Sequence, residues 1–400
     1  MRTVTFLFTL LISMSLIGCT EQSLPQFGDP MPVTVPSGKP AFGPRLTQST
    51  SDDAILSWME RRDDGSSLRF ANYKEGSWQP PQIAVSDEKM FVNWADLPAV
   101  TAVGPETLLA YWLSYTADAT YAYQVLTAFS TDAGVTWSTP GSPHDDGTPT
   151  EHGFVSSFPA VNGTGLIWLD GRDTPDAGMT LRGATLAADG QLHDEILLDD
   201  LVCDCCQTDI AMMAAGPVAI YRNRTEDEVR DIYVSRHRDG KWQPGTPISN
   251  DGWVISGCPV NGPAIAAAEK RVAVGWFTAA DNKPTVKVAL STNAGKSFSE
   301  PVEISSKNAQ GRVGVAMIDR NSFAISWMES EKKGTYAIKL RSVTFDGQMG
   351  PVHIVGRTSL ARTVPQLARV ADNLVLAWTD TIGDLSKVVS VEVPILGFYD

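Results

Sequence analysis

The chain has 400 residues, 43% of them apolar, which is enough for a large buried core, and its 33 glycines and 25 prolines indicate many turns. The formal net charge is −14 at pH 7. Because a nucleic-acid backbone needs a basic face, this charge argues against nucleic acid as a partner.

The first eighteen residues, Met1–Gly18, have the pattern of a targeting segment. Arg2 precedes the apolar run Thr3–Ile17, which is too short to span a bilayer comfortably. The run ends Leu-Ile-Gly-Cys, which resembles the lipobox of bacterial lipoproteins. This resemblance implies cleavage before Cys19 and attachment of lipid to it. The alternative is an ordinary secretory signal with a cysteine nearby, and either segment would export the protein.

Thr20, in place of an Asp, resembles the sorting rule for outer-membrane lipoproteins. We therefore expect a lipid-anchored protein of the bacterial cell envelope, at the outer membrane facing the periplasm, whose only membrane contact is the lipid. Residues 21–40 are rich in Gln, Pro, Gly and Ser, which is typical of a tether. The expected organisation is a signal peptide at 1–18, the lipidated cysteine and tether at 19–40, and one globular domain at 41–400.

A short apolar strand that carries one aromatic residue recurs seven times in the globular part, at intervals of 51 to 56 residues. A repeat of this length with several strands per unit predicts a β-propeller. The seventh unit has three strands at most, and Met31–Val35 is expected to supply its missing outer strand and close the ring. The aromatic residues are Trp58, Trp112, Trp168, Tyr221, Trp276, Trp327 and Trp378.

Two octapeptides predict matching turns between strands. Ser130–Trp137 reads Ser-Thr-Asp-Ala-Gly-Val-Thr-Trp, and Ser291–Phe298 repeats the pattern with Asn293 and Phe298 in place of the Asp and the Trp. The first resembles a full Asp-box, the hairpin of the sialidase (BNR-repeat) superfamily. The resemblance implies propeller blades. We expect an all-β, seven-bladed propeller closed by an N-terminal strand, with the six-bladed sialidase-type propeller as the alternative.

The antiparallel order of a blade places the start of strand one and the end of strand two at the same face, which we call the strand-one mouth. The Asp-box turns lie at the opposite face, so function is expected at the strand-one mouth. Counting back from each aromatic places polar residues at the start of strand one: Asp96, His152, Cys205, Cys206, Asn261, Arg312, Arg362 and Thr363. Counting forward gives Glu60, Ser114, Asp170, Asn223, Thr278, Glu329 and Asp380. The alternative is that these residues simply line a solvated channel.

The family resemblance implies glycoside hydrolysis at this mouth, with arginines that hold a sugar carboxylate, a carboxylic acid and a phenolic nucleophile. The segment around Arg45 is similar to the start of the sialidase propeller. The candidate substrate-binding residues are Arg45, Arg172, Arg222, Arg312 and Arg362. The candidate catalytic residues are Glu60, Asp96, Asp170 and Tyr221, with Tyr115 as a second phenol. Spacing assigns no Tyr–Glu pair, which a sialidase needs.

Four cysteines are also expected at the mouth, at the starts of the fourth and fifth inner strands: Cys203, Cys205, Cys206 and Cys258. Outside the cytosol they predict one or two disulfides, for example from Cys203 or Cys206 to Cys258. Three cysteines within four residues are poorly placed for disulfides all at once. A thiolate site for copper or zinc, with His152 as a further ligand, and a reactive thiol pair are therefore the alternatives.

The leading hypothesis is a sialidase-like propeller that binds or hydrolyses glycans at the mouth. The ligand could also be another small molecule. The second is a non-catalytic envelope propeller with a Cys/His metal site or a disulfide staple. The third is a protein-docking platform.

Overall fold

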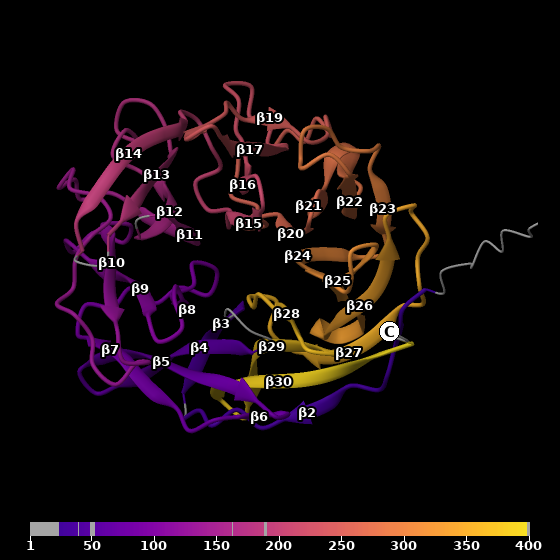
Figure 1. Ribbon diagram of the computed structural model, residues 1–400, viewed down its shortest axis with the longest axis horizontal. Helices are drawn as coiled ribbons and strands as arrows, with labels where there is room; N and C mark the ends of the chain where they lie inside the picture. Colours follow the sequence, from indigo (N-terminus) through magenta and orange to yellow (C-terminus); the bar gives the residue numbers. More distant parts are fainter. Residues whose placement is uncertain (1–23, 39, 49–52, 162, 188–189, 398–400) are drawn as a thin grey trace, which may run out of the picture.

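The computed structural model describes residues 24–38, 40–48, 53–161, 163–187 and 190–397. They form seven antiparallel sheets arranged as a ring (Figure 1). The seven-bladed propeller predicted from the repeat is therefore confirmed, and the six-bladed alternative is wrong. Cys19 lies outside the described residues. Within the described part of the chain, no helix is long and apolar enough to cross a membrane.

We number the blades in chain order from the first complete sheet. Blade 1 comprises β3 (Ala41–Gln48), β4 (Ala54–Arg62), β5 (Gly65–Lys74), β6 (Ser77–Trp78) and β7 (Gln82–Asp87). Blade 2 comprises β8 (Ala99–Ala102), β9 (Leu108–Tyr115) and β10 (Tyr123–Ser130). Blade 3 comprises β11 (His152–Ala160), β12 (Gly163–Asp170), β13 (Thr180–Leu186) and β14 (Leu192–Asp199).

Blade 4 comprises β15 (Asp209–Met213), β16 (Gly216–Arg222), β17 (Ile232–Arg238), β18 (Lys241–Trp242) and β19 (Thr246–Pro247). Blade 5 comprises β20 (Ala264–Ala268), β21 (Arg271–Thr278), β22 (Thr285–Ser291) and β23 (Val302–Ser305). Blade 6 comprises β24 (Ala309–Met317), β25 (Ser322–Ser330), β26 (Tyr336–Thr344) and β27 (His353–Thr358). Short 3-10 turns at Ala280–Asn282 and Lys332–Gly334 connect the second and third strands of blades 5 and 6.

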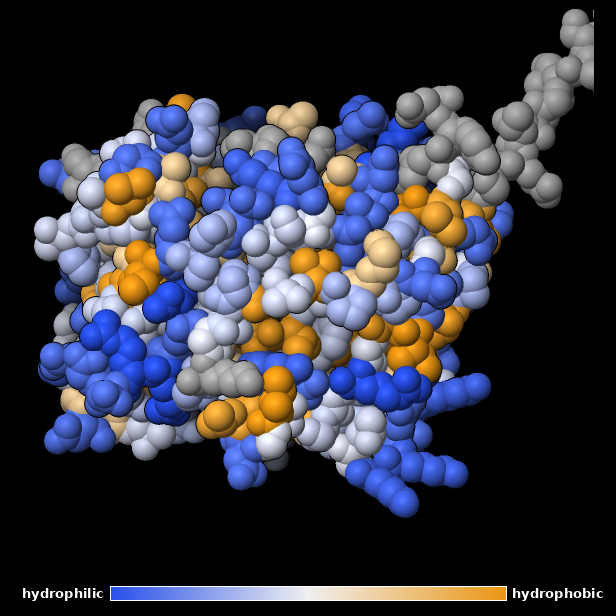
Figure 2. All heavy atoms as spheres, turned by 90° about the horizontal axis from the view of Figure 1, so that it is seen from below, coloured by the Kyte–Doolittle hydropathy of each residue, from blue (hydrophilic) through white to orange (hydrophobic). Residues whose placement is uncertain are grey.

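Blade 7 closes the ring by joining the two ends of the chain. It contains β28 (Gln366–Val370), β29 (Asn373–Ile382) and β30 (Leu385–Leu396), and β1 (Gln26–Phe27) and β2 (Met31–Val33) both pair with β30. The predicted closure by the N-terminal strand is confirmed. Part of the segment that reads as a tether in the sequence thus belongs to the propeller. Figure 2 shows that this side of the ring is mainly hydrophilic, with apolar side chains in scattered groups.

The aromatic residues of the second strands form the core of the blades. Six of the seven are at most 1% exposed, and Trp378 is 4% exposed. Six of them also donate a hydrogen bond to a carboxylate, which satisfies a buried polar group that would otherwise destabilise the fold. In blades 1, 3 and 6 the acceptor lies two residues further along the same strand, as in the pairs Trp58–Glu60 (2.8 Å) and Trp168–Asp170 (2.7 Å). In blades 2, 4 and 5 it comes from the preceding blade: Asp87 ends β7, Asp199 ends β14, and Asp251 follows β19.

The two octapeptides form the predicted turns. Asp132 Oδ1 accepts hydrogen bonds from Ser130 Oγ (2.8 Å) and from the Thr136 backbone (2.8 Å). Asn293 makes the equivalent bonds in blade 5. Trp137 packs edge-on against Phe70 of blade 1, with ring centroids 6.1 Å apart. In blade 2 the residues after Trp137 do not form a fourth named strand; Gly141 makes one antiparallel bridge to Thr127 of β10, and the segment from there to β11 is a long connection.

Candidate functional site at the strand-one mouth

The mouth of blades 2 and 3 holds a tyrosine between two carboxyl groups. Tyr123 Oη lies 2.5 Å from Glu151 Oε1 and 3.4 Å from Asp96 Oδ2. Tyr123 opens β10, and a parallel bridge pairs its backbone with that of Glu151, just before β11. Asp96 precedes β8 and accepts the Phe154 backbone N–H at 2.7 Å. The local fold therefore brings three segments to one point.

Burial changes the ionisation of this cluster. It raises the pKa of Asp96 to about 8, although the Phe154 N–H and the Arg45 charge oppose the rise. Burial also raises the pKa of Glu151 to about 7. The pKa of Tyr123 lies well above its usual value because of burial and the two neighbouring carboxylates. The Tyr123 hydroxyl can donate its one hydrogen bond to only one carboxylate at a time. The other carboxyl group is therefore more stable when protonated, and near neutral pH this group is Asp96.

A glycine makes room for this carboxylate. Gly153 lies against Asp96, and a Cβ atom at this position would stand only 1.9 Å from Asp96 Oδ2. Any larger residue would therefore displace Asp96 or Tyr123, whose ring is also close. The sequence Glu151–Gly153 thus supplies one acidic side chain and the space for another.

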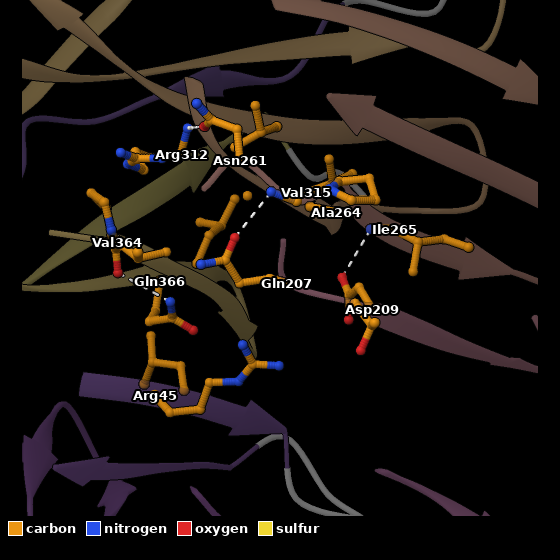
Figure 3. Close-up of a pocket in the computed structure, with 18 residues that line it drawn as sticks. Arg45, Gln207, Asp209, Asn261, Ala264, Ile265, Arg312, Val315, Val364 and Gln366 are labelled. Carbon is orange, nitrogen blue, oxygen red and sulfur yellow. Dashed lines mark hydrogen bonds between the residues drawn. The ribbon is translucent and has the colours of Figure 1, made fainter. Parts of the chain in front are cut away.

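Two adjoining cavities lie in the centre of the ring. The one nearer the strand-one mouth has a volume of about 190 Å³, and the other has a volume of about 420 Å³. The larger value falls within the range of about 300–1,000 Å³ typical of small-molecule sites. Both cavities are lined by Arg45 from β3 and Asp209 from β15, and Figure 3 shows both side chains pointing into the smaller one. The charged pair therefore marks the junction between the cavities.

Asp209 is held firmly at this junction. Its side chain is only partly exposed, and its Oδ2 accepts the Ile265 backbone N–H at 2.9 Å (Figure 3). Burial raises the pKa of Asp209, and the positive charge of Arg45 opposes that rise. A ligand at this junction would thus meet the guanidinium group of Arg45 and the carboxyl group of Asp209.

A loop that contains Trp94 lies over the smaller cavity. The guanidinium of Arg312 stacks on the Trp94 ring, 4.7 Å from its centroid, although the two belong to blades 6 and 2. Gln207 donates to Ala95 O at 2.9 Å and accepts the Gly262 N–H at 3.0 Å. These contacts join blades 2, 4, 5 and 6 at the mouth, so the loop is attached to two residues that line the cavity, Arg312 and Gln207.

The four cysteines converge at the mouth as predicted, and they form two disulfides. Cys203 pairs with Cys206, and Cys205 pairs with Cys258 across blades 4 and 5. The Cα–Cα distances are 5.7 and 6.1 Å, within the usual range. The disulfide alternative thus describes the structure, but the partner of Cys258 is Cys205 rather than Cys203 or Cys206. The short Cys203–Cys206 pairing explains how three cysteines in four residues can all be used.

His152 does not join the cysteines. Its ring bonds to Asp146 and to backbone carbonyls, and it lies 3.5 Å from Asp170 Oδ1. Asp170 in turn accepts a hydrogen bond from Trp168 Nε1, and its two oxygens form a bidentate ion pair with the guanidinium group of Arg172. Both predicted residues, Asp170 and Arg172, are therefore engaged with each other rather than with the central cavities.

The remaining predicted residues separate into two groups. Arg45 and Arg312 line the smaller cavity, whereas Arg362 is exposed on the loop before β28. Glu60 accepts Trp58 Nε1 and pairs with Arg69. Tyr221 donates to Asp199 at 2.6 Å, and Arg222 is 2% exposed with its donors directed to backbone carbonyls. The structure thus brings Arg45, Arg312 and Asp96 toward the mouth, leaves Arg362 exposed, and engages the others in structural contacts.

Sequence reasoning missed Tyr123, Glu151, Trp94 and Asp209. Glu151 directly precedes His152, which counting back from Trp168 placed at the start of an inner strand. The position of Glu151 at the mouth could therefore have been predicted from the sequence. Tyr123 belongs to a third strand, and its register opposite Tyr115 places it at the mouth. No spacing rule for first and second strands could have found it.

Comparisons with known proteins support the fold. No family model matches the sequence, and no curated protein matches it. A protein of unknown function from Dyadobacter fermentans is similar in structure, with a TM-score of 0.51 and 12% identity over 93% of this chain and 99% of that one. An α-L-arabinofuranosidase from Fusarium graminearum has a TM-score of 0.50 and 13% identity over 80% of this chain and 98% of its own.

The polysaccharide lyase Uly1 has a TM-score of 0.50 and 10% identity over 93% of this chain and 100% of its own. Sialidases, among them NanB of Streptococcus pneumoniae, also match, but their scores of at most 0.47 are too low to support an argument. At these identities the likeness shows the fold alone. The propeller that the Asp-box resemblance implied is therefore confirmed.

Proposed function

We propose that the protein acts on glycans at its strand-one mouth, as a glycoside hydrolase that uses Tyr123, Glu151 and Asp96. The observation that carries the proposal is the 2.5 Å contact between Tyr123 Oη and Glu151 Oε1, with Asp96 beside it. A tyrosine in contact with a glutamate is the kind of pair that the family resemblance requires, and this supports the proposal. The similarity of the fold to an arabinofuranosidase and a polysaccharide lyase supports a glycan as substrate class.

Each residue has a role that fits its surroundings. Tyr123 attacks the anomeric carbon while Glu151 takes the phenol proton, so that a covalent glycosyl-enzyme forms and the leaving-group oxygen departs. Asp96 supplies the proton to that oxygen, since burial keeps its pKa near 8. Water then releases the sugar, with Asp96 acting as the base and Glu151 returning the proton to Tyr123.

The arginines of the smaller cavity suit an acidic sugar. Arg45 and Arg312 line this cavity, and a guanidinium group binds a carboxylate through two parallel hydrogen bonds. An exo-acting sialidase is the specific form of this proposal. Because Tyr123 and Asp96 are 1% and 2% exposed, the loop that carries Trp94 and Asp96 has to move for substrate to reach them.

The test measures turnover of fluorogenic glycosides by the full chain, with sialic acid and arabinofuranose as the sugars. We expect release of the fluorophore from at least one of them, and a loss of about 100-fold or more in Tyr123→Phe and Glu151→Gln. Tyr121→Phe is the matched control, because Tyr121 is 61% exposed nearby and should keep full activity. The absence of turnover by correctly folded wild-type protein, or full activity in Tyr123→Phe, would contradict the proposal.

A second candidate function is a non-catalytic propeller that binds a glycan or docks a protein. The burial of Tyr123 and Asp96 and the contacts of Trp94 across the mouth favour it. Under this alternative the same glycosides bind without turnover, and Arg45→Ala weakens binding while Tyr123→Phe leaves it unchanged. Calorimetry with non-hydrolysable sugars therefore separates the two candidates.

We further infer that the protein is anchored in the cell envelope through lipid on Cys19. The support is the sequence Leu-Ile-Gly-Cys that ends at this residue. Incorporation of labelled palmitate in a bacterial host tests the inference, with Cys19→Ser as the variant that should lose the label. Equal labelling of both proteins would contradict it.

A further inference from the structure

Two histidines and an aspartate converge beside blade 3, away from the cysteines. His144 and Asp146 lie in the connection between β10 and β11, and His152 is the first residue of β11. Asp146 Oδ2 lies 2.9 Å from His144 Nδ1 and 3.1 Å from His152 Nε2. Asp170 Oδ1 is 3.5 Å from the same His152 nitrogen. The histidine and aspartate side chains are all at least nine-tenths buried.

Backbone contacts fix the orientation of His152. Its Nδ1 lies 3.0 Å from Thr150 O and 3.3 Å from Tyr123 O. Carbonyl oxygens only accept hydrogen bonds, so Nδ1 carries the proton. Because Nε2 faces the carboxylates of Asp146 and Asp170, this nitrogen has to carry a proton or bind a metal ion. A histidine that binds a metal characteristically donates its other N–H to a carbonyl in this way.

Asp146 is oriented in a similar manner. Its Oδ1 accepts the Thr148 backbone N–H at 2.9 Å and also the Thr148 hydroxyl. These bonds leave Oδ2 directed toward both histidines. His144 faces the same oxygen through its Nδ1, at 2.9 Å. Ordered support for ligand atoms is the usual arrangement around a bound metal.

The charges around the cluster do not balance. The carboxylates of Asp146, Asp170, Asp173 and Glu195 are linked by ion pairs to only two guanidinium groups, those of Arg172 and Arg182. Two negative charges therefore remain. The rings of His144 and His152 are stacked in parallel with centroids 4.0 Å apart, so two imidazolium ions would repel each other. A proton on His152 would neutralise one of these charges, whereas one divalent cation would neutralise both and leave both rings neutral.

We propose that His144, Asp146 and His152 bind a zinc ion, with Asp170 next to the fourth coordination position. Imidazole nitrogen and carboxylate oxygen are zinc ligands. Ligand atoms about 2.0–2.1 Å from a tetrahedral ion lie about 3.3 Å apart, close to the separations of 2.9 to 3.5 Å in the pairs His144–Asp146, Asp146–His152 and His152–Asp170. Because the two imidazole rings are stacked in parallel, one of them has to turn before both can direct a nitrogen lone pair at the same ion. The ion would fasten the connection that replaces the fourth strand of blade 2 onto blade 3. This site differs from the Cys/His site predicted from the sequence, because His152 would bind the ion together with His144 and Asp146 and not with the cysteines.

The first experiment measures zinc binding by the full chain under non-reducing conditions. After removal of metal by chelation, wild-type protein is titrated with Zn²⁺ and its metal content is determined by mass spectrometry. We expect one Zn²⁺ per chain and a higher melting temperature on binding. His144→Ala and Asp146→Asn should weaken binding by about 100-fold or more, since even changes behind the ligands cost about 10–100-fold. His193→Ala, in an exposed position, should bind normally.

A second measurement needs no variant and so does not depend on how the variants fold. In Co²⁺-loaded wild-type protein we expect ligand-field bands of nitrogen and oxygen ligands without a thiolate charge-transfer band. The absence of stoichiometric Zn²⁺ binding by folded wild-type protein would overturn the proposal. Normal binding in His144→Ala would do so as well, and a thiolate band would assign the metal to the cysteines instead.

Discussion

The indole nitrogen of Trp168 lies 2.7 Å from Asp170 Oδ2, and this pairing of a buried aromatic donor with a carboxylate recurs in six of the seven blades. It gives several carboxylates a structural purpose. Glu60 and Asp170, which the sequence offered as catalytic acids, are acceptors of this kind. The exception is blade 7, where Trp378 Nε1 is buried and has no partner among the described residues.

Because only the tryptophan of blade 3 donates to a carboxylate, replacing tryptophan by phenylalanine should destabilise the protein more in blade 3 than in blade 7. Trp168→Phe removes a hydrogen bond to a charged acceptor, whereas Trp378→Phe removes none, and both remove a similar apolar area. We expect Trp168→Phe to lower the free energy of unfolding by about 1.5–3 kcal/mol more than Trp378→Phe. Urea denaturation of the two variants measures the difference. Equal losses would show that the pairing contributes nothing to stability.

Arg222 is expected to be structural rather than substrate-binding. Its guanidinium donates to Asn261 O at 3.0 and 2.9 Å, to Arg230 O at 2.6 Å and to Phe277 O at 2.7 Å, and it stacks on Trp253. Arg222→Lys keeps the charge but cannot reach all three carbonyls.

We expect Arg222→Lys to lower the free energy of unfolding by about 3 kcal/mol, measured by urea denaturation. Arg362→Ala, an exposed control, should change it by less than about 0.5 kcal/mol. If Arg222→Lys kept wild-type stability but lost ligand binding, the role in substrate binding predicted from the sequence would be correct instead.

The sequence predicted the ring because its signal is local and repeated. A buried aromatic at 51 to 56-residue spacing marks each second strand, and the apolar segment Met31–Val35 marks the closing strand. The site was harder to predict because it depends on contacts between blades. Tyr123 and Glu151 meet through a bridge between a third strand and the segment before the next blade.

The cysteines show the same limit. Their convergence followed from topology alone, since both segments begin inner strands of neighbouring blades. Their pairing depended on the path of the short loop before β15, where Cys203 turns back to Cys206 and leaves Cys205 for Cys258. No pattern of spacing specifies that path.

The raised pKa values of Asp96 and Glu151 predict that stability falls as pH rises. In the folded protein these values are about 8 and about 7, whereas an unfolded carboxyl group titrates near about 4. Between these limits the folded state binds more protons than the unfolded state, so the free energy of unfolding decreases with increasing pH. The stabilisation is complete below about pH 4 and is lost as pH passes through about 7 to 8.

Asp96→Asn isolates the contribution of one group. We expect wild-type protein to lose roughly 4 kcal/mol more than Asp96→Asn between about pH 5 and pH 8.5, as measured by urea denaturation. Asp64→Asn is a suitable control, because Asp64 is exposed and should follow the wild type. A pH profile of Asp96→Asn that is parallel to that of the wild type would show that Asp96 is not protonated in the folded state.

The disulfide between Cys205 and Cys258 should stabilise the mouth more than its neighbour does. It closes a loop with a sequence separation of 53, whereas Cys203–Cys206 has a separation of 3. Cross-linking restricts the unfolded chain more when the loop is longer, so Cys258→Ser should lower the free energy of unfolding by about 2–4 kcal/mol and Cys206→Ser by less. Denaturation with and without reductant measures both effects, and thiol titration of native wild-type protein should find these four cysteines oxidised. Four free thiols together with stoichiometric metal would instead support the thiolate site predicted from the sequence.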